Sequence, residues 1–409
     1  MDALAALSIL ALMAQVHAQC ISENDMYVLE AQPNLTSATP FSTLLFKEVL
    51  PSSGNFFFSP FSIWMALVLS YFGSRGKTEA QLEAVLALDA KVDALAMYKA
   101  LTQLYQASAS EEYTISTANR IYVDASLPLR KCLKNVLSDE VQNINFAQPD
   151  EAAASINKFV NTATRGKIPD FLHSSDVTGS EMALVNAVYF KGFWKQKFKL
   201  EDTKKEMFFA SPDELVFVDM MGQIGTHRYG ESKELNTQVL EMRYEGDGAS
   251  MFVYLPKGKK TGQELDEMLK KMTPELLLTS MRHDELKEDK VHVKMPKFKL
   301  ETTLKRTLKT ALIHMGLHDL FSLKADLTGF SPAGGLRLTN SIHRAVLEVT
   351  EEGTEAVAAT VLKGGRTARR TRPFTCDRPF FFLIRDNSRG NILFMGVYRK
   401  PSTAVLSVM

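Results

Sequence analysis

The chain has 409 residues, of which 45% are hydrophobic and 23% are charged, and its formal net charge is +1. This is the composition of a globular protein that is long enough to bury a large core. A net charge near zero gives no support for a nucleic-acid partner or a membrane partner, and we expect neither.

The first element in the chain is an apolar run over residues 4–13. Its length suits the hydrophobic region of a signal peptide and is too short to span a bilayer. Small or tolerated residues at 16–18 precede a cut at Gln19, although no Lys or Arg precedes the run. We therefore predict a signal peptide at residues 1–18 and a secreted, extracellular protein. Asn34, in the only N-x-S/T triplet of the chain, would then be a glycosylation site.

The remaining elements alternate between helical and strand patterns. A helix is predicted from Pro60 to about Gly73, because Ser59 can cap it and proline suits the first helical position. Strands are predicted at 182–190, 250–255 and 291–300, and a C-terminal hairpin at 380–384 and 392–397. No linker rich in glycine or proline divides the chain. We expect an α+β fold with a large sheet.

The three cysteines are Cys20, Cys132 and Cys376. They are too few for a disulfide-stapled scaffold in a chain of this length. One disulfide with one free thiol fits the sequence, and so do three reduced thiols. Because the chain has no CxxC motif and no Cys/His cluster, we expect neither a metal nor another cofactor.

Motifs of common enzymes are absent, including GxSxG, HExxH and GxGxxG. The GKT triplet at 76–78 resembles the end of a phosphate-binding loop. Such a loop needs a glycine five residues before Gly76, and that position is Tyr71. The triplet also follows a predicted helix rather than a strand. We therefore predict that the protein is not an enzyme.

Five blocks, in matching order and spacing over nearly the whole chain after its N-terminal segment, resemble the serpin family of serine protease inhibitors. The blocks are NFFFSPFSI (55–63) with GSRGKT (73–78), NKFVNTATRGKI (157–168) with LVNAVYFKGFWKQKF (184–198), MPKF (295–298) with DLTGFS (326–331) and IHRA (342–345), EEGTEAVAAT (351–360), and DRPFFFLIRD (377–386).

The resemblance implies a single domain over residues 19–409, with three β-sheets, about nine helices and an exposed reactive-centre loop at about 351–376. Serpins offer this loop to a protease as a false substrate. After cleavage, the part before the cut inserts into the main sheet while the protease is still an acyl-enzyme. We accordingly expect a monomer that forms a covalent complex with a serine protease.

The residues of the loop suit insertion between two strands. An inserted strand needs small side chains and no proline, and no proline occurs between Glu351 and Arg372. Alternate positions, which share one face of a strand, carry only Thr or Ala from 354 to 360. By themselves these residues would also suit a flexible linker. The resemblance assigns the hinge of the loop to Glu352, Gly353, Thr354, Glu355, Ala356, Ala358, Ala359 and Thr360.

Arginines in the loop suggest which bond is cleaved. Family spacing from the hinge glycine places the cleaved residue at Thr367, and spacing from the downstream proline places it at Ala368. Arginines lie close to both positions, and trypsin-like proteases hold an arginine in their primary pocket. We prefer Arg366–Thr367, because the family tolerates loops one residue short of the common count. Arg369–Arg370 is the alternative. The pair Arg366-x-x-Arg369 also fits a minimal site for furin-like proprotein convertases.

The resemblance assigns two supporting sites. A buried polar cluster, the shutter, lies where the central strands part, and such groups need mutual hydrogen bonds. Its residues are Ser59, Ser62, Asn186 and His343. Trp194 occupies the breach, which the loop enters first. Some serpins bind heparin through a basic helix, but residues 80–106 offer only Lys91 and Lys99, so we expect no strong heparin site.

Two functions are compatible with this family. The first is inhibition of trypsin-like proteases, and the second is a non-inhibitory role as a carrier, chaperone or storage protein. Non-inhibitory members often carry bulky, charged or proline residues at the hinge. The small residues Thr354, Ala356 and Ala358 favour inhibition.

Overall fold

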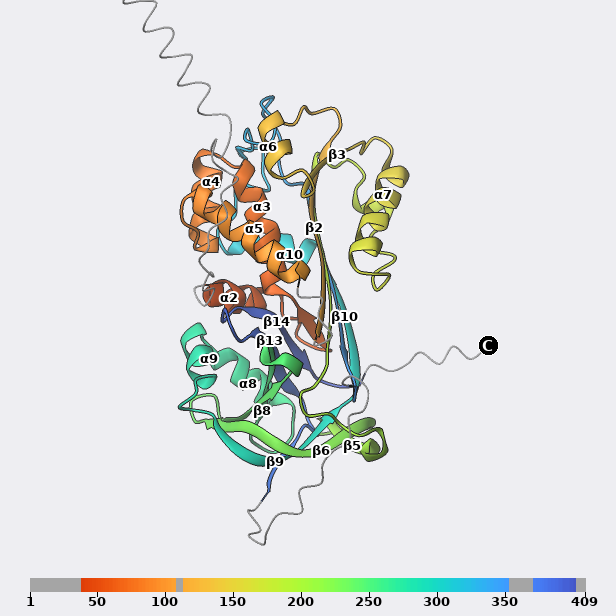
Figure 1. Cartoon of the computed structure of the whole chain (residues 1–409), viewed down its shortest axis with the longest axis vertical. Coiled ribbons are helices and arrows are strands. Elements are labelled where there is room, and N and C mark those ends of the chain that lie inside the picture. The colour runs from red at the N-terminus through yellow and green to blue at the C-terminus, as the bar shows by residue number, and fades with distance from the viewer. Residues whose placement is uncertain (1–37, 108–112, 353–370, 402–409) are drawn as a thin grey trace, which may run out of the picture.

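The computed structural model describes residues 38–107, 113–352 and 371–401. Nine α-helices occur in this part of the chain (Figure 1): α2 (Thr39–Val49), α3 (Pro60–Gly73), α4 (Gly76–Leu86), α5 (Lys91–Ala107), α6 (Lys131–Val136), α7 (Pro149–Ala163), α8 (Gln263–Lys271), α9 (Pro274–Ser280) and α10 (Arg306–His314).

A five-stranded sheet has the order β10 (Phe298–Leu304), β11 (Asn340–Val349), β4 (Met182–Gly192), β2 (Tyr113–Asp124) and β3 (Val141–Ile144). Its central neighbours, β11 and β4, run parallel, whereas β10 and β2 are antiparallel to the strands beside them in the centre. Figure 1 shows this sheet edge-on, with α7 on one side and α3 and α5 on the other.

The other strands form one hydrogen-bonded network of nine. Its order is β1 (Phe56–Phe58), β14 (Ile392–Tyr398), β13 (Phe380–Asp386), β8 (Ala249–Pro256), β7 (Thr237–Arg243), β6 (Glu214–Ser232), β9 (Lys287–Pro296) and β12 (Arg372–Thr375), and β5 (Lys204–Ser211) also pairs with β6.

Strand β6 is 19 residues long and pairs with three different strands along its length. Its first segment pairs with β5, its middle with β9 and its last residues with β7. The expected α+β class and about nine helices are confirmed, and the described strands form these two hydrogen-bonded networks.

Helix α3 lies at the centre of the core. Every residue from Pro60 to Gly73 is buried, and the Ser59 hydroxyl accepts a hydrogen bond from the backbone N–H of Ser62. The predicted start and end of this helix are confirmed. The predicted hairpin is formed by β13 and β14, and the apolar run at 182–190 is buried in β4.

One predicted strand is in fact two. The segment 291–300 belongs partly to β9 in the nine-stranded network and partly to β10 in the five-stranded sheet. Pro296 ends β9, since proline has no N–H to donate to a ladder. The N–H of Lys297 then bonds to the carbonyl oxygen of Asp219, and the chain crosses to the other sheet.

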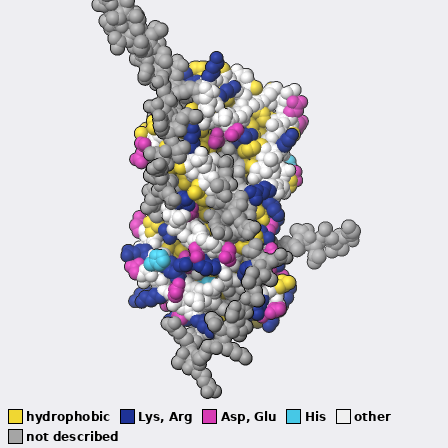
Figure 2. Space-filling view, viewed as in Figure 1, with side chains coloured by type: hydrophobic (Ala, Val, Ile, Leu, Met, Phe, Trp, Pro, Cys, Tyr) yellow, Lys and Arg dark blue, Asp and Glu magenta, His cyan; other side chains and the backbone are white. Residues whose placement is uncertain are grey.

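The surface of the described residues carries charges of both signs. On the face in Figure 2, basic and acidic side chains are interspersed over the visible surface. None of the helices in the described part of the chain is both long enough and apolar enough to cross a membrane.

Candidate functional site

The parallel pair β11 and β4 leads directly to the predicted loop. Strand β11 ends at Val349, and the chain re-enters the described part at Thr371, just before β12 in the other sheet. The segment between them therefore links the two sheets. Most of the predicted loop residues lie outside the described residues: Gly353, Thr354, Glu355, Ala356, Ala358, Ala359, Thr360, Arg366, Thr367, Arg369 and Arg370.

The base of the loop, residues 350–352, is held at three consecutive positions. The indole nitrogen of Trp194 donates a hydrogen bond to the carbonyl oxygen of Thr350 at 2.9 Å. The carboxylate of Glu351 accepts from the Thr203 hydroxyl at 2.9 Å and pairs with the ammonium group of Lys297 at 2.8 Å. One residue further on, Glu352 pairs with Lys191 at 2.9 Å.

These contacts differ in burial. The side chain of Glu351 is 7% exposed, and that of Glu352 is 68% exposed. Burial opposes ionisation of Glu351, but hydrogen bonds from Lys297 and Thr203 outweigh it and lower the pKa of this carboxyl. Sequence reasoning missed Glu351 and both of its partners. The sequence signal that could have indicated Glu351 is its position, since a charged residue directly after an apolar strand needs a partner.

Trp194 is fixed by aromatic packing. Its ring stacks on Tyr244 with 4.6 Å between centroids and 14° between planes, and Phe198 meets it edge-on. Gly192 allows this arrangement, because a Cβ there would lie 2.3 Å from the Tyr244 ring. The side chain predicted at the breach therefore lies buried beside the base of the loop.

The four residues predicted for the shutter lie together at the seam between β11 and β4. The nitrogen Nε2 of His343 accepts a hydrogen bond from the Ser59 N–H at 3.3 Å, and its Nδ1 bonds to the amide oxygen of Asn186. The amide nitrogen of Asn186 donates to the carbonyl oxygen of Ser62 at 3.0 Å and to the side-chain oxygen of Asn119. Sequence reasoning missed Asn119, which lies in β2.

The hydrogen bonds define the tautomer of His343. Because Nε2 accepts, Nδ1 carries the proton and donates to Asn186. The imidazole is fully buried, and burial lowers its pKa to about 3, so the ring is neutral at pH 7. The cluster joins the start of α3 to β4 and β11 without a buried charge.

Cys376 is buried and has a free thiol, and burial raises the pKa of that thiol. Cys20 lies outside the described residues. The described residues therefore do not decide between one disulfide with one free thiol and three reduced thiols.

Comparisons with known proteins agree with this architecture. The family model described as Serpin (serine protease inhibitor) matches residues 36–401. Leukocyte elastase inhibitor A of Mus musculus is 36% identical over 397 residues, which cover 94% of this chain and 100% of that protein. Serpin B11 of Homo sapiens is 35% identical and covers 90% of this chain and 99% of its own.

Among solved structures, uncleaved ovalbumin superposes with a TM-score of 0.79 at 28% identity, covering 90% of this chain and 99% of that one. The structure of maspin gives a TM-score of 0.81 at 28% identity, with coverage of 90% and 98%. The chain belongs to the serpin family. The inhibitory members of this family react with proteases as suicide substrates and are not catalytic enzymes.

The predicted localisation is wrong. The relatives named leukocyte elastase inhibitor and serpin B11 are intracellular serpins, which contradicts a secreted, extracellular protein. The prediction rested on an apolar run at 4–13 that has no basic residue before it, which is only part of the signal-peptide pattern. The proposed signal peptide (1–18) and Asn34 lie outside the described residues, and the relatives support neither a signal peptide nor a glycan.

Proposed function

We propose that the protein is an irreversible suicide-substrate inhibitor of Arg-specific, trypsin-like serine proteases, furin-like proprotein convertases included. The observation that carries the proposal is the direct parallel pairing of β11 and β4 at the base of the loop. A segment that turns back from the end of β11 would run antiparallel to both strands. Insertion would replace one parallel pair by two antiparallel pairs, which are slightly more stable per residue.

The chemistry begins as ordinary proteolysis. The serine hydroxyl of the protease attacks the carbonyl carbon of Arg366, its proton passes through the protease histidine to the leaving amine, and the new N-terminus is Thr367. Arg366 then remains joined to the protease as an ester. If residues 353–366 enter the sheet before water hydrolyses that ester, the protease is carried away from its working geometry and stays attached.

The contacts around β11 and β4 support a closed state that can open. Trp194 and Glu351 hold the base of the loop where an inserting strand would enter. Further along the seam, His343 and Asn186 join the two strands. We propose the breach role for Trp194 and the shutter role for Ser59, Ser62, Asn186 and His343.

The experiment that tests the proposal is incubation with trypsin. We expect a covalent complex that survives boiling in detergent, together with a released C-terminal peptide whose mass begins at Thr367. A peptide beginning at Arg370 would move the reactive bond to Arg369–Arg370. A cleaved loop with fully active trypsin would support the non-inhibitory role instead.

A second protease class is favoured by the names of the relatives, several of which are leukocyte elastase inhibitors. Elastase has a small primary pocket, and Ala368 is a small residue in the loop. Counting from the downstream proline also selects this residue. An elastase complex with a C-terminal peptide that begins at Arg369 would identify this alternative.

A further inference from the structure

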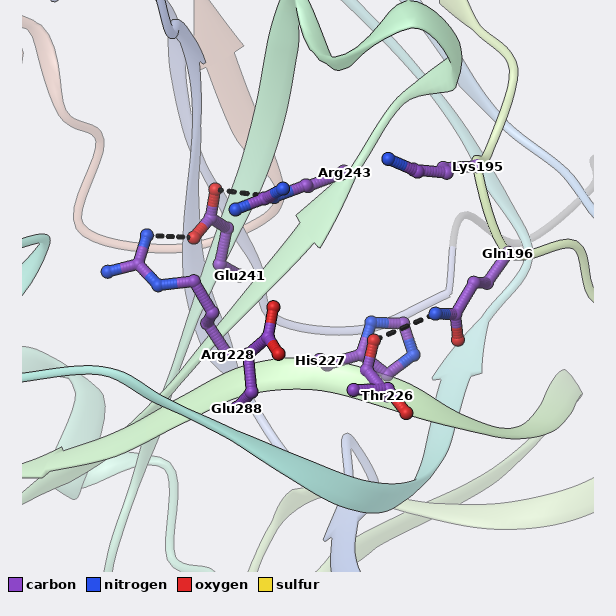
Figure 3. A pocket seen from close by; sticks show the side chains of 8 residues that line it. All are labelled: Lys195, Gln196, Thr226, His227, Arg228, Glu241, Arg243 and Glu288. Carbon is purple, nitrogen blue, oxygen red and sulfur yellow. Dashed lines mark hydrogen bonds and ion pairs between the residues drawn. The ribbon is translucent and has the colours of Figure 1, made fainter. Parts of the chain in front are cut away.

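A pocket of about 140 Å³ is lined by residues that belong to neither β11 nor β4 (Figure 3). Residues from β6, β7 and β9 and from the connection after β4 form its walls. An engineered cavity of about 150 Å³ accepts benzene, so this pocket suits a ligand of roughly six heavy atoms, with some extension toward solvent.

His227 supplies a buried polar atom that faces this pocket. The residue is 7% exposed, and its Nε2 has no hydrogen-bond partner among the described residues. Burial lowers the pKa of the imidazole to about 4, so the ring is neutral at pH 7. A buried polar atom without a partner destabilises the folded protein, and a polar ligand that bonds to it would remove that cost.

Two cations form one wall. The guanidinium group of Arg243 lies 3.6 Å from Glu241 and 3.5 Å from Asp247, distances longer than those of N–H···O hydrogen bonds. Its N–H groups therefore keep their capacity to donate. The ammonium group of Lys195 also bonds to Asp247 and has three donors in all. In Figure 3 both side chains approach the pocket from the side opposite His227.

An acid faces the same space. Glu288 in β9 is paired in register with Arg228 in β6, but the guanidinium group of Arg228 is directed to Glu241 at 2.5 Å. The carboxylate of Glu241 also accepts a hydrogen bond from the Ser250 hydroxyl at 2.8 Å. Within the described part of the chain, the carboxylate of Glu288 makes no ion pair, and its side chain is exposed at the rim.

The lining carries both signs of charge, with Lys195, Arg228 and Arg243 against Glu241 and Glu288, and Asp247 behind the wall pairs with Lys195 and Arg243. A simple anion would meet Glu288, and a simple cation would meet the wall formed by Lys195 and Arg243. Each would use only half of the charged groups that can still accept a partner. A molecule with both charges would use both halves.

We propose that this pocket binds a small zwitterion with a carboxylate and an ammonium group, of the class of free α-amino acids. The carboxylate accepts hydrogen bonds from Arg243 and Lys195, and the ammonium group donates to Glu288. His227 Nε2 bonds to whichever polar group of the ligand reaches the floor. The site does not depend on protease inhibition.

Calorimetric titration of the full-length protein tests this with three matched probes. Alanine carries both groups, propionate lacks the ammonium group and ethylamine lacks the carboxylate. We expect saturable binding of alanine in the millimolar range and binding of the other two weaker by about tenfold or more, which corresponds to about 1.4 kcal/mol. Equal affinity for alanine and propionate, or no saturable heat with alanine, would overturn the proposal.

Variants locate the site. Glu288→Gln should weaken alanine binding by about tenfold, which corresponds to about 1.4 kcal/mol, because it removes a charge-assisted contact, and it should not weaken propionate binding. Glu285→Gln, which changes an exposed acid that does not line the pocket, is the matched control and should bind like the parent protein. Undiminished alanine binding by Glu288→Gln would contradict the assignment. Because the readout is binding, failure here leaves the trypsin experiment unaffected.

Discussion

His343 in β11 and Asn186 in β4 are paired in register across the parallel seam, and a hydrogen bond joins their side chains. Neighbouring strands lie about 4.8 Å apart, and insertion of another strand would double that separation. The direct bond between these two side chains could not persist. We infer that the same contact that closes the resting sheet must break when the loop enters.

The pH dependence of stability follows from this histidine. The pKa of His343 in the folded state is about 3, below the usual 6.5, so the unfolded chain binds a proton that the folded protein excludes. Stability therefore falls as the pH drops from 6.5 towards 3, by up to about 1.4 kcal/mol per pH unit. His227, with a pKa of about 4, acts in the same direction.

Urea unfolding at pH 7 and pH 5 measures this effect. The parent protein should lose stability between these values, and His343→Gln should lose less. Gln keeps an amide that can replace the hydrogen bonds without taking up a proton. An identical loss in the parent and in His343→Gln would show that this histidine does not titrate on unfolding.

Trp194→Phe tests the hydrogen bond at the base of the loop. The change keeps an aromatic ring against Tyr244 but removes the donor to Thr350, at a cost of about 1 kcal/mol. We expect a loosened base and faster hydrogen exchange in residues 350–352. Trp64→Phe is the matched control, because it removes a bond of 3.0 Å to Leu86 away from the loop. Equal exchange in both variants would argue against a special role for Trp194.

Neighbouring glutamates provide a second matched pair. Glu351→Gln weakens a buried contact to Lys297 and should destabilise the protein by about 1–2 kcal/mol, discounted because Lys297 is partly exposed. Glu352→Gln removes an exposed pair with Lys191 and should cost less than about 0.5 kcal/mol. Chemical denaturation measures both. A larger loss of stability in Glu352→Gln than in Glu351→Gln would mean that Glu352, and not Glu351, holds the base of the loop.

Arginine at either of two neighbouring loop positions tests which side chains face the interior of the sheet after insertion. Thr354→Arg would force a charged side chain into the sheet during insertion, so trypsin should cleave the loop and escape. Glu355→Arg places the same side chain on the other face of the inserted strand, and the covalent complex should still form. The two variants are compared by the yield of complex in denaturing gels. Similar yields would mean that the proposed insertion register is wrong.

Local signals predicted several elements well. The Ser59–Pro60 pair determined the start of α3, and a continuous apolar run determined β4. The segment 291–300 was predicted as one strand because both of its halves alternate. An alternating pattern of apolar and polar residues does not show that Pro296 ends one ladder and that the next residues pair in another sheet.

Contacts between residues far apart in the chain could not be predicted from local sequence patterns. The shutter residues came from family resemblance, and no local pattern joins Ser59 to His343 across 284 positions. Asn119 completes that cluster but lies in an alternating strand whose sequence marks no special role. Thr203 and Lys297 meet Glu351 only because the two sheets approach at the base of the loop.

The most direct test compares thermal unfolding of the intact protein with that of protein cleaved in the loop. If the severed segment enters between β11 and β4, about ten new backbone hydrogen bonds would add on the order of 10 kcal/mol. The cleaved protein should then unfold at a clearly higher temperature than the intact protein. Unfolding of the cleaved protein at the same or a lower temperature would contradict insertion and, with it, the proposed mechanism of inhibition.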